Sequence, residues 1–599
     1  MPFARDNKLY ILGISCFYHD SAAALLCDGE LVAAAEEERF SRVKHDFGFP
    51  ELAIEFCLKK AGIEAGDLDY VVFYEKPFLK FERLLNTILQ TFPSSLNVFQ
   101  GSMINWFGDK LWVKGIIYKR LSIALDKILF TEHHMSHAAS AYFASPFEES
   151  SVLTVDGVGE WATTTMGRAR GQEIALEREQ RFPHSLGLLY SAFTAYLGFE
   201  VNEGEYKVMG MAPYGEPKYL DEVWKTVRRE GNGSFSLDMD YFTFHRSTTR
   251  SFGEKLTDLL GPSREPESQF FTRSSGYPGY YGPKPADYEA ACRRNEHYAD
   301  IASSIQRVTE ELVLDMAGAL HRSTGLDKLC MAGGVALNSV ANGRLLRESG
   351  FKEIYIQPAA GDGGGALGAA LYVHNAVLKG KRSPVMTHAY WGEEYSAAEA
   401  ADQLSAEGAR WEEIADEGEL LGRVSESIMA GDVIGWHQGR FEWGPRALGH
   451  RSILANPTSE AMKEIVNTKI KFREPFRPFA PSVLADKAGE YFDIDEPERH
   501  YPARYMLLVV PVREEAKSKL PAITHVDGTG RLQTVVKEES PLYYRLIETF
   551  GEASGVPVVL NTSFNLRGEP IVNTPADAWR TFTASEMDKL VVGNFLMSK

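Results

Sequence analysis

Short apolar runs separated by polar turns open the chain and predict strands. The runs at 9–15, 22–27 and 30–35 are each of strand length, and a short polar loop separates the first two. Asp28-Gly29 joins the second run to the third, and Asp-Gly between apolar runs is one of the strongest short hairpin signals. We therefore predict a three-stranded antiparallel unit at this end of the chain.

The same pattern returns further along the chain. A β-branched run at 151–155 precedes an acidic and glycine-rich loop at 156–160, and a Thr-rich run at 161–166 follows. A turn at 170–172 then leads to a further run at 173–177. Repetition of strand, polar loop, strand, turn and strand indicates a duplicated fold, although two unrelated hairpins would give the same local pattern.

Two later strands run into glycines. The first, at 328–332, precedes a helix-like stretch, and the second, at 354–357, precedes the glycines of 361–365 and a helix of small residues at 366–373. Glycines between a strand and a helix let backbone N–H groups approach phosphates, helped by the helix N-terminus. This order of acidic and glycine loops resembles the duplicated nucleotide-binding fold shared by actin, Hsp70 and sugar kinases. We predict these nucleotide-binding residues in the loops: Asp156, Gly157, Gly333, Gly334 and Asn338.

Insertions and a polar break divide the chain. Residues 77–130 carry Leu, Ile, Trp and Phe at mixed helical spacing, and residues 220–300 include a loop rich in Tyr and Pro. We interpret both as additions on the substrate side. The polar break at 380–384 predicts the domain boundary. It places a two-lobed domain at 1–385 and a second α/β domain at 386–599.

Composition excludes several classes of protein. A chain of 599 residues with 44% hydrophobic content is long enough for more than one core. No apolar run reaches the ~18 residues of a membrane span, and the polar start of the chain is unlike a signal peptide. Five scattered cysteines without a CxxC pair favour a reduced, cytoplasmic protein without disulfides. The net charge of −18 argues against nucleic-acid binding.

A pair of histidines predicts a metal site. His133 and His137 begin an Ala-rich stretch of helical character, and a spacing of four places them on one helix face. Asp362, in a glycine loop, supplies a third ligand. Two imidazoles and one carboxylate leave open positions and suit iron, zinc or manganese about equally well. A purely structural role of the histidine pair is the alternative, and we assign no role to His134.

Basic residues gather in the second domain. Between Gly435 and Phe479 there are eight basic residues against four acidic ones, in a chain that is acidic overall. Guanidinium groups form bidentate pairs with phosphate or carboxylate, and a lysine adds a compact charge. An anion-rich ligand such as a nucleoside triphosphate would fit them. A charged, solvated surface is the alternative, but these residues lie among aromatic ones: Trp443, Phe472, Phe476 and Phe479.

Seven motifs are spread over nearly the whole chain. They are Tyr18-His19-Asp20-Ser21-Ala22-Ala23, Glu37-Glu38-Arg39-Phe40-Ser41-Arg42, His133-His134-Met135-Ser136-His137-Ala138, Asp156-Gly157-Val158-Gly159-Glu160, Lys207-Val208-Met209-Gly210-Met211-Ala212-Pro213-Tyr214-Gly215, Gly444 to Ser452 and Asn561-Thr562-Ser563-Phe564-Asn565. These motifs resemble those of the O-carbamoyltransferases of antibiotic, nodulation-factor and natural-product biosynthesis, and their number and order make the resemblance specific.

The resemblance implies two modules and two half-reactions. The N-terminal module is similar to the metal- and nucleotide-binding subunit of the tRNA threonylcarbamoyl transferases, and the C-terminal α/β module to threonylcarbamoyl-adenylate synthase. In the family, carbamoyl phosphate and ATP, with Mg²⁺, give carbamoyl-adenylate in the C-terminal module. The hydroxyl of a small-molecule acceptor then attacks the adenylate in the N-terminal module, and AMP is released.

The resemblance also implies roles for individual residues. His133, His137 and Asp362 would hold a divalent metal, with Fe²⁺ expected and Zn²⁺ or Mn²⁺ as alternatives. His19, with an unperturbed pKa of about 6.5, would accept the hydroxyl proton or orient the acceptor, and Asp20 is the alternative base. Lys471 and Arg531 would be catalytic in activation, within an adenylation pocket formed by Arg446, Lys471, Arg477, Arg531, Ser563 and Asn565.

Four other functions remain to be compared with this one. A sugar or acid kinase would not need the second domain, and a tRNA-modifying enzyme would need a positive surface. Hydrogenase-maturation carbamoyltransferases carry Cys-paired zinc fingers, which require CxxC motifs. A chaperone-like nucleotide switch would leave the basic residues unexplained.

We expect ATP, carbamoyl phosphate and a hydroxylated small molecule as partners and neither nucleic acid nor membrane. The sequence leaves the acceptor's identity and a homodimer open.

Overall fold

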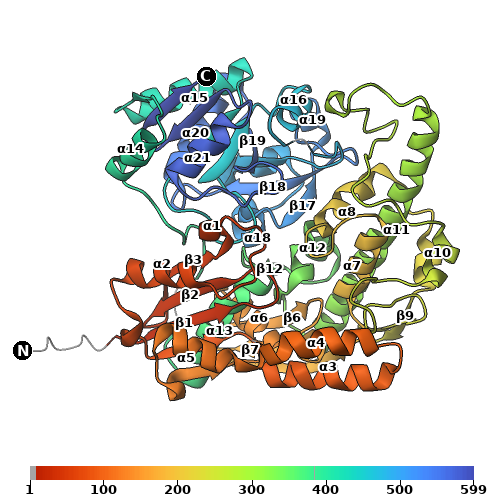
Figure 1. Ribbon diagram of the computed structural model, residues 1–599. Helices are drawn as coiled ribbons and strands as arrows, with labels where there is room; N and C mark the ends of the chain where they lie inside the picture. Colours follow the sequence, from red (N-terminus) through yellow and green to blue (C-terminus); the bar gives the residue numbers. More distant parts are fainter. Residues whose placement is uncertain (1–7, 109, 383–384, 472) are drawn as a thin grey trace, which may run out of the picture.

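The computed structural model describes residues 8–108, 110–382, 385–471 and 473–599 (Figure 1). Part of the polar break predicted at 380–384, and Phe472, lie outside the described residues. The strands form two five-stranded sheets, a nine-stranded sheet and a two-stranded hairpin of β9 (Val227–Gly231) and β10 (Ser234–Leu237). No helix in the described ranges is both long and apolar enough to cross a membrane.

The first sheet has the order β3-β2-β1-β4-β5. Strands β1, β2 and β3 pair antiparallel, whereas β4 and β5 continue the sheet in parallel with β1. The hairpin predicted around Asp28-Gly29 is therefore confirmed. The bounds are β1 Tyr10–Ser15, β2 Ala22–Cys27, β3 Glu30–Glu36, β4 Tyr70–Phe73 and β5 Ile128–Phe130.

The second sheet repeats this topology. Its order, β8-β7-β6-β11-β12, has an antiparallel meander at one side and two parallel strands at the other. The predicted duplication is confirmed by this match of strand order and direction. The bounds are β6 Glu149–Val155, β7 Ala162–Arg170, β8 Glu173–Arg181, β11 Lys328–Ala332 and β12 Glu353–Tyr355. Strand β12 thus ends two residues before the predicted Gln357.

Helices α6 (His133–Tyr142) and α13 (Asp362–Tyr372) lie between the two sheets, with α13 on β1 and β2 and α6 on β6 and β11. The glycines predicted as a phosphate loop at 361–365 mostly belong to α13, which corrects the sequence interpretation. Gly364 and Gly365 are closely packed, because a Cβ at Gly364 would lie 2.0 Å from the Ala359 oxygen and one at Gly365 would lie 2.8 Å from the Tyr74 ring. Gly361 and Gly363 line the cavity.

The helical insertions lie where the sequence predicted them. Helices α3 (Pro77–Thr91), α4 (Leu96–Gly108) and α5 (Val113–Leu121) separate β4 from β5. The 37-residue helix α11 (Tyr288–Thr324) crosses the second lobe (Figure 1). The remaining helices of this part are α1 Glu38–Ser41, α2 Glu51–Ala61, α7 Leu186–Tyr196, α8 Glu205–Met211, α9 Leu220–Trp224, α10 Glu254–Leu260 and α12 Ser339–Glu348.

The C-terminal part is built on the nine-stranded mixed sheet, with the order β13-β21-β20-β14-β15-β19-β16-β18-β17. Helices α15 and α20 cover one face and α14 and α21 the other, each through a separate apolar core. The strands are β13 Glu412–Glu413, β14 Ile434–His437, β15 Arg451–Ala455, β16 Ala480–Leu484, β17 Leu508–Pro511, β18 Thr529–Val535, β19 Val558–Ser563, β20 Lys589–Val592 and β21 Phe595–Ser598. The helices are α14 Ala397–Ala406, α15 Glu417–Ala430, α16 Met462–Val466, α17 Ala488–Tyr491, α18 Tyr501–Arg504, α19 Glu514–Lys517, α20 Pro541–Ser554 and α21 Pro575–Thr583.

Candidate functional site

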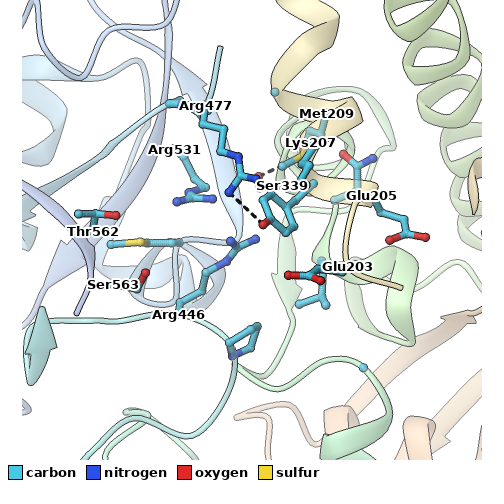
Figure 2. Close-up of a pocket in the computed structure, with 18 of the residues that line it drawn as sticks. Glu203, Glu205, Lys207, Met209, Ser339, Arg446, Arg477, Arg531, Thr562 and Ser563 are labelled. Atoms are coloured by element: carbon cyan, nitrogen blue, oxygen red, sulfur yellow. Dashed lines mark hydrogen bonds between the residues drawn. The ribbon is translucent and has the colours of Figure 1, made fainter. Parts of the chain in front are cut away.

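One cavity of about 640 Å³ is lined by both halves of the chain. In Figure 2, Arg446, Arg477 and Arg531 lie on the side of the C-terminal sheet, and Lys207 and Ser339 face them from the N-terminal half. The sequence predicts one site in each module, and residues from both predicted sites line this one continuous cavity.

Four buried side chains converge at one end of this cavity. His133 and His137 come from α6, Asp156 follows β6, and Asp362 is the first residue of α13. The Nε2 atoms of the two histidines are 3.1 Å apart, and Asp156 Oδ2 lies 2.9 Å from that of His133. Asp362 Oδ1 lies 3.6 Å from His133 Nε2 and 3.4 Å from His137 Nε2.

These spacings fit a metal ion. Ligand atoms about 2.1 Å from a tetrahedral cation lie about 3.4 Å from one another, close to the separations observed. Both carboxylate oxygens of Asp362 are buried without a hydrogen-bond partner among the described residues, which a cation would satisfy. Burial lowers the pKa of His137, but the carboxylates of Asp156 and Asp362, at 3.7 Å and 3.4 Å from its Nε2, raise that pKa to about 9. The two carboxylates thus favour positive charge between the imidazoles.

Asp156, the fourth member of this cluster, was predicted from the sequence to bind nucleotide. Asp156 and Asp362 line the cavity, whereas His133 and His137 are almost completely buried. Asp156 Oδ1 also accepts a hydrogen bond from the Gly334 N–H at 2.9 Å. Its carboxylate therefore connects the cluster to the glycine turn that follows β11.

Of the other residues predicted to bind nucleotide, three line the cavity and Gly333 does not. Gly157, Gly334 and Asn338 line the cavity, and Asn338 caps α12 by accepting a hydrogen bond from the Ala341 N–H. Gly333 is not among the described residues that line the cavity, and its ligand-binding role stays a prediction. It has a φ of +98°, and a Cβ there would lie 2.3 Å from the Val155 oxygen, so close packing of the turn requires glycine.

His19 and Asp20 lie in the loop between β1 and β2, beside the metal cluster in the cavity lining. Asp20 Oδ2 is 2.9 Å from His19 Nδ1, and Asp20 Oδ1 is 2.7 Å from His45 Nδ1. Asp20 therefore bridges two imidazoles. Because His19 Nδ1 is engaged by Asp20, its Nε2 is the nitrogen that remains for an acceptor hydroxyl.

The protonation state of His19 differs from the sequence expectation of a pKa near neutrality. Burial by itself lowers its pKa, but the hydrogen bond to Asp20 and the charges of Asp362, Asp20 and Asp156 outweigh burial and raise the pKa to about 9. His19 is therefore protonated at pH 7 in this arrangement. A cation among the carboxylates would offset their charge and return the pKa of His19 towards neutrality.

At the other end of the cavity, Lys471 organises the segment predicted to bind phosphate or carbamoyl oxygens. Its Nζ donates to the backbone oxygens of Ser563 at 2.5 Å and Asn565 at 2.8 Å, and to Asn565 Oδ1 at 2.9 Å. Burial, together with Arg473 and Arg477, lowers its pKa well below the ordinary lysine value. Lys471, Ser563 and Asn565 thus form one contact group, as the sequence predicted.

Three arginines add charge that the described side chains do not neutralise. Arg446 Nε, Arg473 Nη2 and Arg531 Nε are buried and lack hydrogen-bond partners among the described residues. Burial, followed by the charges of Arg446 and Arg473, lowers the pKa of Arg531 well below its usual range. An anion in this space would be a partner for all three guanidinium groups.

Arg477 is placed differently from the other predicted arginines. Its Nε pairs with Glu474 at 2.7 Å, and its Nη1 donates to the Tyr206 hydroxyl at 3.1 Å (Figure 2). Tyr206 belongs to α8 of the N-terminal half, so this arginine connects the two sides of the cavity. It lines the cavity, but part of its charge is already balanced.

Sequence reasoning missed three residues at the site. Asp156 was assigned to nucleotide rather than metal, Arg473 was left out of the pocket, and His45 was given no role. Asp156 ends a strand in the same way as a catalytic carboxylate would, which is a usable signal. Nothing in the local sequence connects His45 with Asp20. His134, to which no role was given, hydrogen-bonds Thr154 at 2.6 Å and the Ala162 oxygen at 2.9 Å, as expected of a structural residue.

Comparison with solved structures gives only weak overall similarity. Full-length HypF in its phosphate- and nucleotide-bound form is 14% identical, covers 61% of this chain and 55% of that chain, and has a TM-score of 0.27. A score of this size carries no argument about function. The evidence for the duplicated α/β fold is the matching topology of the two five-stranded sheets.

Sequence comparison is decisive. Residues 10–371 match the family model described as Carbamoyltransferase N-terminus, and residues 425–599 match Carbamoyltransferase C-terminus. The uncharacterised protein sll1178 of Synechocystis is 47% identical over 98% of this chain and 97% of its own length. Nodulation protein NolNO of Sinorhizobium fredii is 37% identical over 97% of this chain and 79% of its own length.

A third relative has a named activity. The 3'-hydroxymethylcephem-O-carbamoyltransferase of Streptomyces clavuligerus is 36% identical over 44% of this chain and 48% of its own length. The family models together span most of the chain, on both sides of the cavity. The chain therefore belongs to the O-carbamoyltransferase family and is a carbamoyl-transferring enzyme.

Proposed function

We propose that the chain is an ATP-dependent O-carbamoyltransferase that forms carbamoyl-adenylate at the cationic end of its cavity and transfers the carbamoyl group at the metal end. The observation that carries this proposal is the continuity of the cavity between two chemically different ends. We place the boundary between the modules at residues 385 and 386. The proposed activating residues would then all belong to the second module.

The cationic end suits activation. Arg446, Arg473 and Arg531 offer charge and hydrogen-bond donors to the phosphates of ATP, with Mg²⁺ expected on the triphosphate. Lys471 would hold Ser563 and Asn565 in place beside them. Carbamoyl-adenylate keeps one of the four phosphorus atoms of its two precursors, so its formation consumes water and releases pyrophosphate and phosphate. Positive charge around the α-phosphate would stabilise the charge that develops in that step.

The metal end suits transfer. His133, His137, Asp156 and Asp362 would hold the cation, with Fe²⁺ expected, and a bound cation supplies Lewis-acid polarisation of a carbonyl or an anchor for a phosphate. Asp20 holds the tautomer of His19, whose Nε2 would take the proton of the acceptor hydroxyl. The hydroxyl oxygen would then bond to the carbamoyl carbon as the bond to the AMP oxygen breaks.

A shared cavity has a chemical advantage over two separate pockets. Carbamoyl-adenylate is a mixed anhydride that water hydrolyses, so passage within one protein-lined space would protect it. Cavity residues from both halves, such as Tyr206 and Arg477, contact each other across this space. The acceptor would be a hydroxylated small molecule, as in the named cephem relative.

The test is product analysis. We expect the enzyme to convert ATP to AMP and pyrophosphate only when carbamoyl phosphate is present, and hydroxylated metabolites to gain the mass of one carbamoyl group. Production of ADP would identify a kinase and contradict the proposal. Elemental analysis of the purified protein would identify the metal, for which we expect iron at about one ion per chain.

A further inference from the structure

We propose that residues 36–42, at the end of β3 and in α1, position the two activating loops of the C-terminal module, so that carbamoyl-adenylate formation depends on the N-terminal module. This inference rests on the proposed function. The segment contains the motif from Glu37 to Arg42, to which the sequence analysis gave no role. Its partners lie more than 400 residues away in the chain.

The first contact holds the loop that carries Arg446. Arg39 Nη2 donates to the Gly444 carbonyl at 2.7 Å, and the Gly444 N–H donates to Glu36 Oε1 at 2.7 Å. The backbone carbonyl and the backbone N–H of Gly444 are thus both bound by the N-terminal module. Arg39 is 2% exposed, so water does not compete for these bonds.

The geometry of Gly444 makes this contact consequential. Gly444 has a φ of +101°, and a Cβ there would lie 2.7 Å from the Pro358 oxygen, another residue of the N-terminal half. Arg446 follows two residues later, and its Nε has no hydrogen-bond partner among the described residues. Because its Nε is not anchored by a hydrogen bond, the position of the Arg446 guanidinium depends on where the backbone at Gly444 is held.

The second contact holds the loop that carries Asn565. Arg42 Nη1 donates to the Ile571 carbonyl at 2.6 Å and Nη2 to the Pro570 carbonyl at 3.1 Å. Within that loop, the Asn565 side-chain amide donates to the Glu569 carbonyl at 2.7 Å. Arg42 therefore fixes the end of the short loop whose other end binds Lys471.

The segment is itself anchored in the N-terminal lobe. Glu37 accepts hydrogen bonds from the N–H groups of Leu52 at 3.1 Å and Ala53 at 2.7 Å, in the first turn of α2. Glu38 accepts one from the His45 N–H at 2.9 Å. Residues 36–42 are hydrogen-bonded to α2 in the N-terminal lobe and to the loops of Gly444 and Ile571 in the C-terminal module. A shift of this segment would therefore shift both loops.

The principal variant is Arg42→Ala, because the Arg42 side chain is 28% exposed and its loss leaves little buried void. We expect pyrophosphate release to fall about 10- to 100-fold, since displacing a binding group by about 1 Å costs this much. Transfer from supplied carbamoyl-adenylate should stay within about two-fold of wild type. The rate of pyrophosphate release by Arg42→Lys should lie between those of wild type and Arg42→Ala, because one lysine nitrogen replaces two guanidinium donors.

The matched control is Arg120→Ala. Arg120 is a half-exposed arginine of α5 in the same module, and it pairs with Glu51 on the surface at 2.9 Å. We expect wild-type pyrophosphate release and transfer from this variant. Arg39→Lys provides a second test of the segment, with retention of the buried positive charge.

Hydrogen exchange provides a readout that does not depend on the chemistry. In Arg42→Ala we expect faster amide exchange at residues 565–573, and in Arg39→Lys faster exchange at 442–446, where the Gly444 N–H is the most direct probe. Unchanged exchange in both variants overturns the inference. If both half-reactions and the melting temperature fall together, Arg42 has only a structural role and the inference is also wrong.

Failure of the proposed function would be recognised separately. A wild-type enzyme that releases no pyrophosphate with carbamoyl phosphate contradicts the adenylate pathway before any variant is compared. The exchange measurement would then still decide whether residues 36–42 hold the two loops. Faster exchange would support the positioning role, and unchanged exchange would overturn it.

Discussion

The two ends of the cavity differ in how their buried charged groups are paired. At the metal end, His133 and His137 lie within 3.7 Å of carboxylate oxygens from Asp156 and Asp362. At the cationic end, like charges gather, and burial together with neighbouring arginines depresses the pKa of Lys471. One end is arranged for a cation and the other for an anion.

This difference has an energetic meaning. Burying like charges without partners costs stability, so such groups persist mainly where a ligand neutralises them. The negative charge of Asp156 and Asp362 can be balanced by one resident cation. The charges of Arg446 and Arg531 would be balanced only while an anionic substrate is bound. We therefore expect the metal end to be occupied throughout the cycle and the cationic end to be occupied only in turnover.

The largest expected effect is removal of the metal ligands. His133→Ala or His137→Ala should lower bound metal to background and carbamoyl transfer below detection, because two of four ligand atoms come from this pair. Carbamoyl-adenylate formation should continue near the wild-type rate, since activation uses the other end. Elemental analysis and the two half-reaction assays check this.

His297→Ala, on α11 outside the cavity lining, serves as the control for loss of a histidine. Equal loss of adenylate formation in a folded His137→Ala variant would show that the two ends do not act independently. It would break the comparison of the two ends.

The next effect concerns the cationic end. Lys471→Ala should lower carbamoyl-phosphate-dependent pyrophosphate release about 10³-fold, because it removes charge and leaves the oxygens of Ser563 and Asn565 without their donor. Arg531→Ala should act in the same direction. Metal content should be unchanged in both variants.

Lys469→Ala is a matched control only two residues away. Lys469 pairs with Asp588 at 2.9 Å and is not among the described residues that line the cavity. It should release pyrophosphate at the wild-type rate. If Lys471→Ala equals Lys469→Ala in the assay, Lys471 is not part of the activating site.

The smallest effect is expected at His19, which lies at the metal end but is not a ligand of the cluster. His19→Asn should slow transfer about 10²-fold, because the amide keeps hydrogen bonding but cannot accept the proton. Supplied carbamoyl-adenylate should not rescue it. Wild-type transfer in this variant would assign proton acceptance to Asp20 or another group.

The pH profile tests the same role. The pKa of His19, about 9 without a cation, would move towards neutrality when a cation offsets the charges of Asp156 and Asp362. Transfer by the metal-loaded wild-type enzyme should therefore rise about ten-fold per pH unit below this lowered pKa and level off above it. His19→Asn should lack this rise, and an identical rise in the variant would exclude His19 as its origin.

Local sequence patterns determined the elements and several of the contacts made within one element. The hairpin turn at Asp28-Gly29 and the strand at 328–332 were predicted because side-chain periodicity and turn chemistry act over a few residues. His133 and His137 were paired correctly because a spacing of four fixes a common face on any helix. The repeated strands, taken together with the two later glycine loops, also predicted the duplicated fold.

Only the tertiary structure decided which distant groups share a space. Asp156 joined the histidines because β6 ends beside α6, and His45 met Asp20 through a loop that no periodicity describes. Gly364 and Gly365 proved to pack closely against Ala359 and Tyr74, which depends on partners outside α13. Arg39 and Gly444 meet across 405 residues of chain. The sequence thus specified residue types and local geometry, whereas charge balance and access to one cavity arise from contacts that form when the modules pack together.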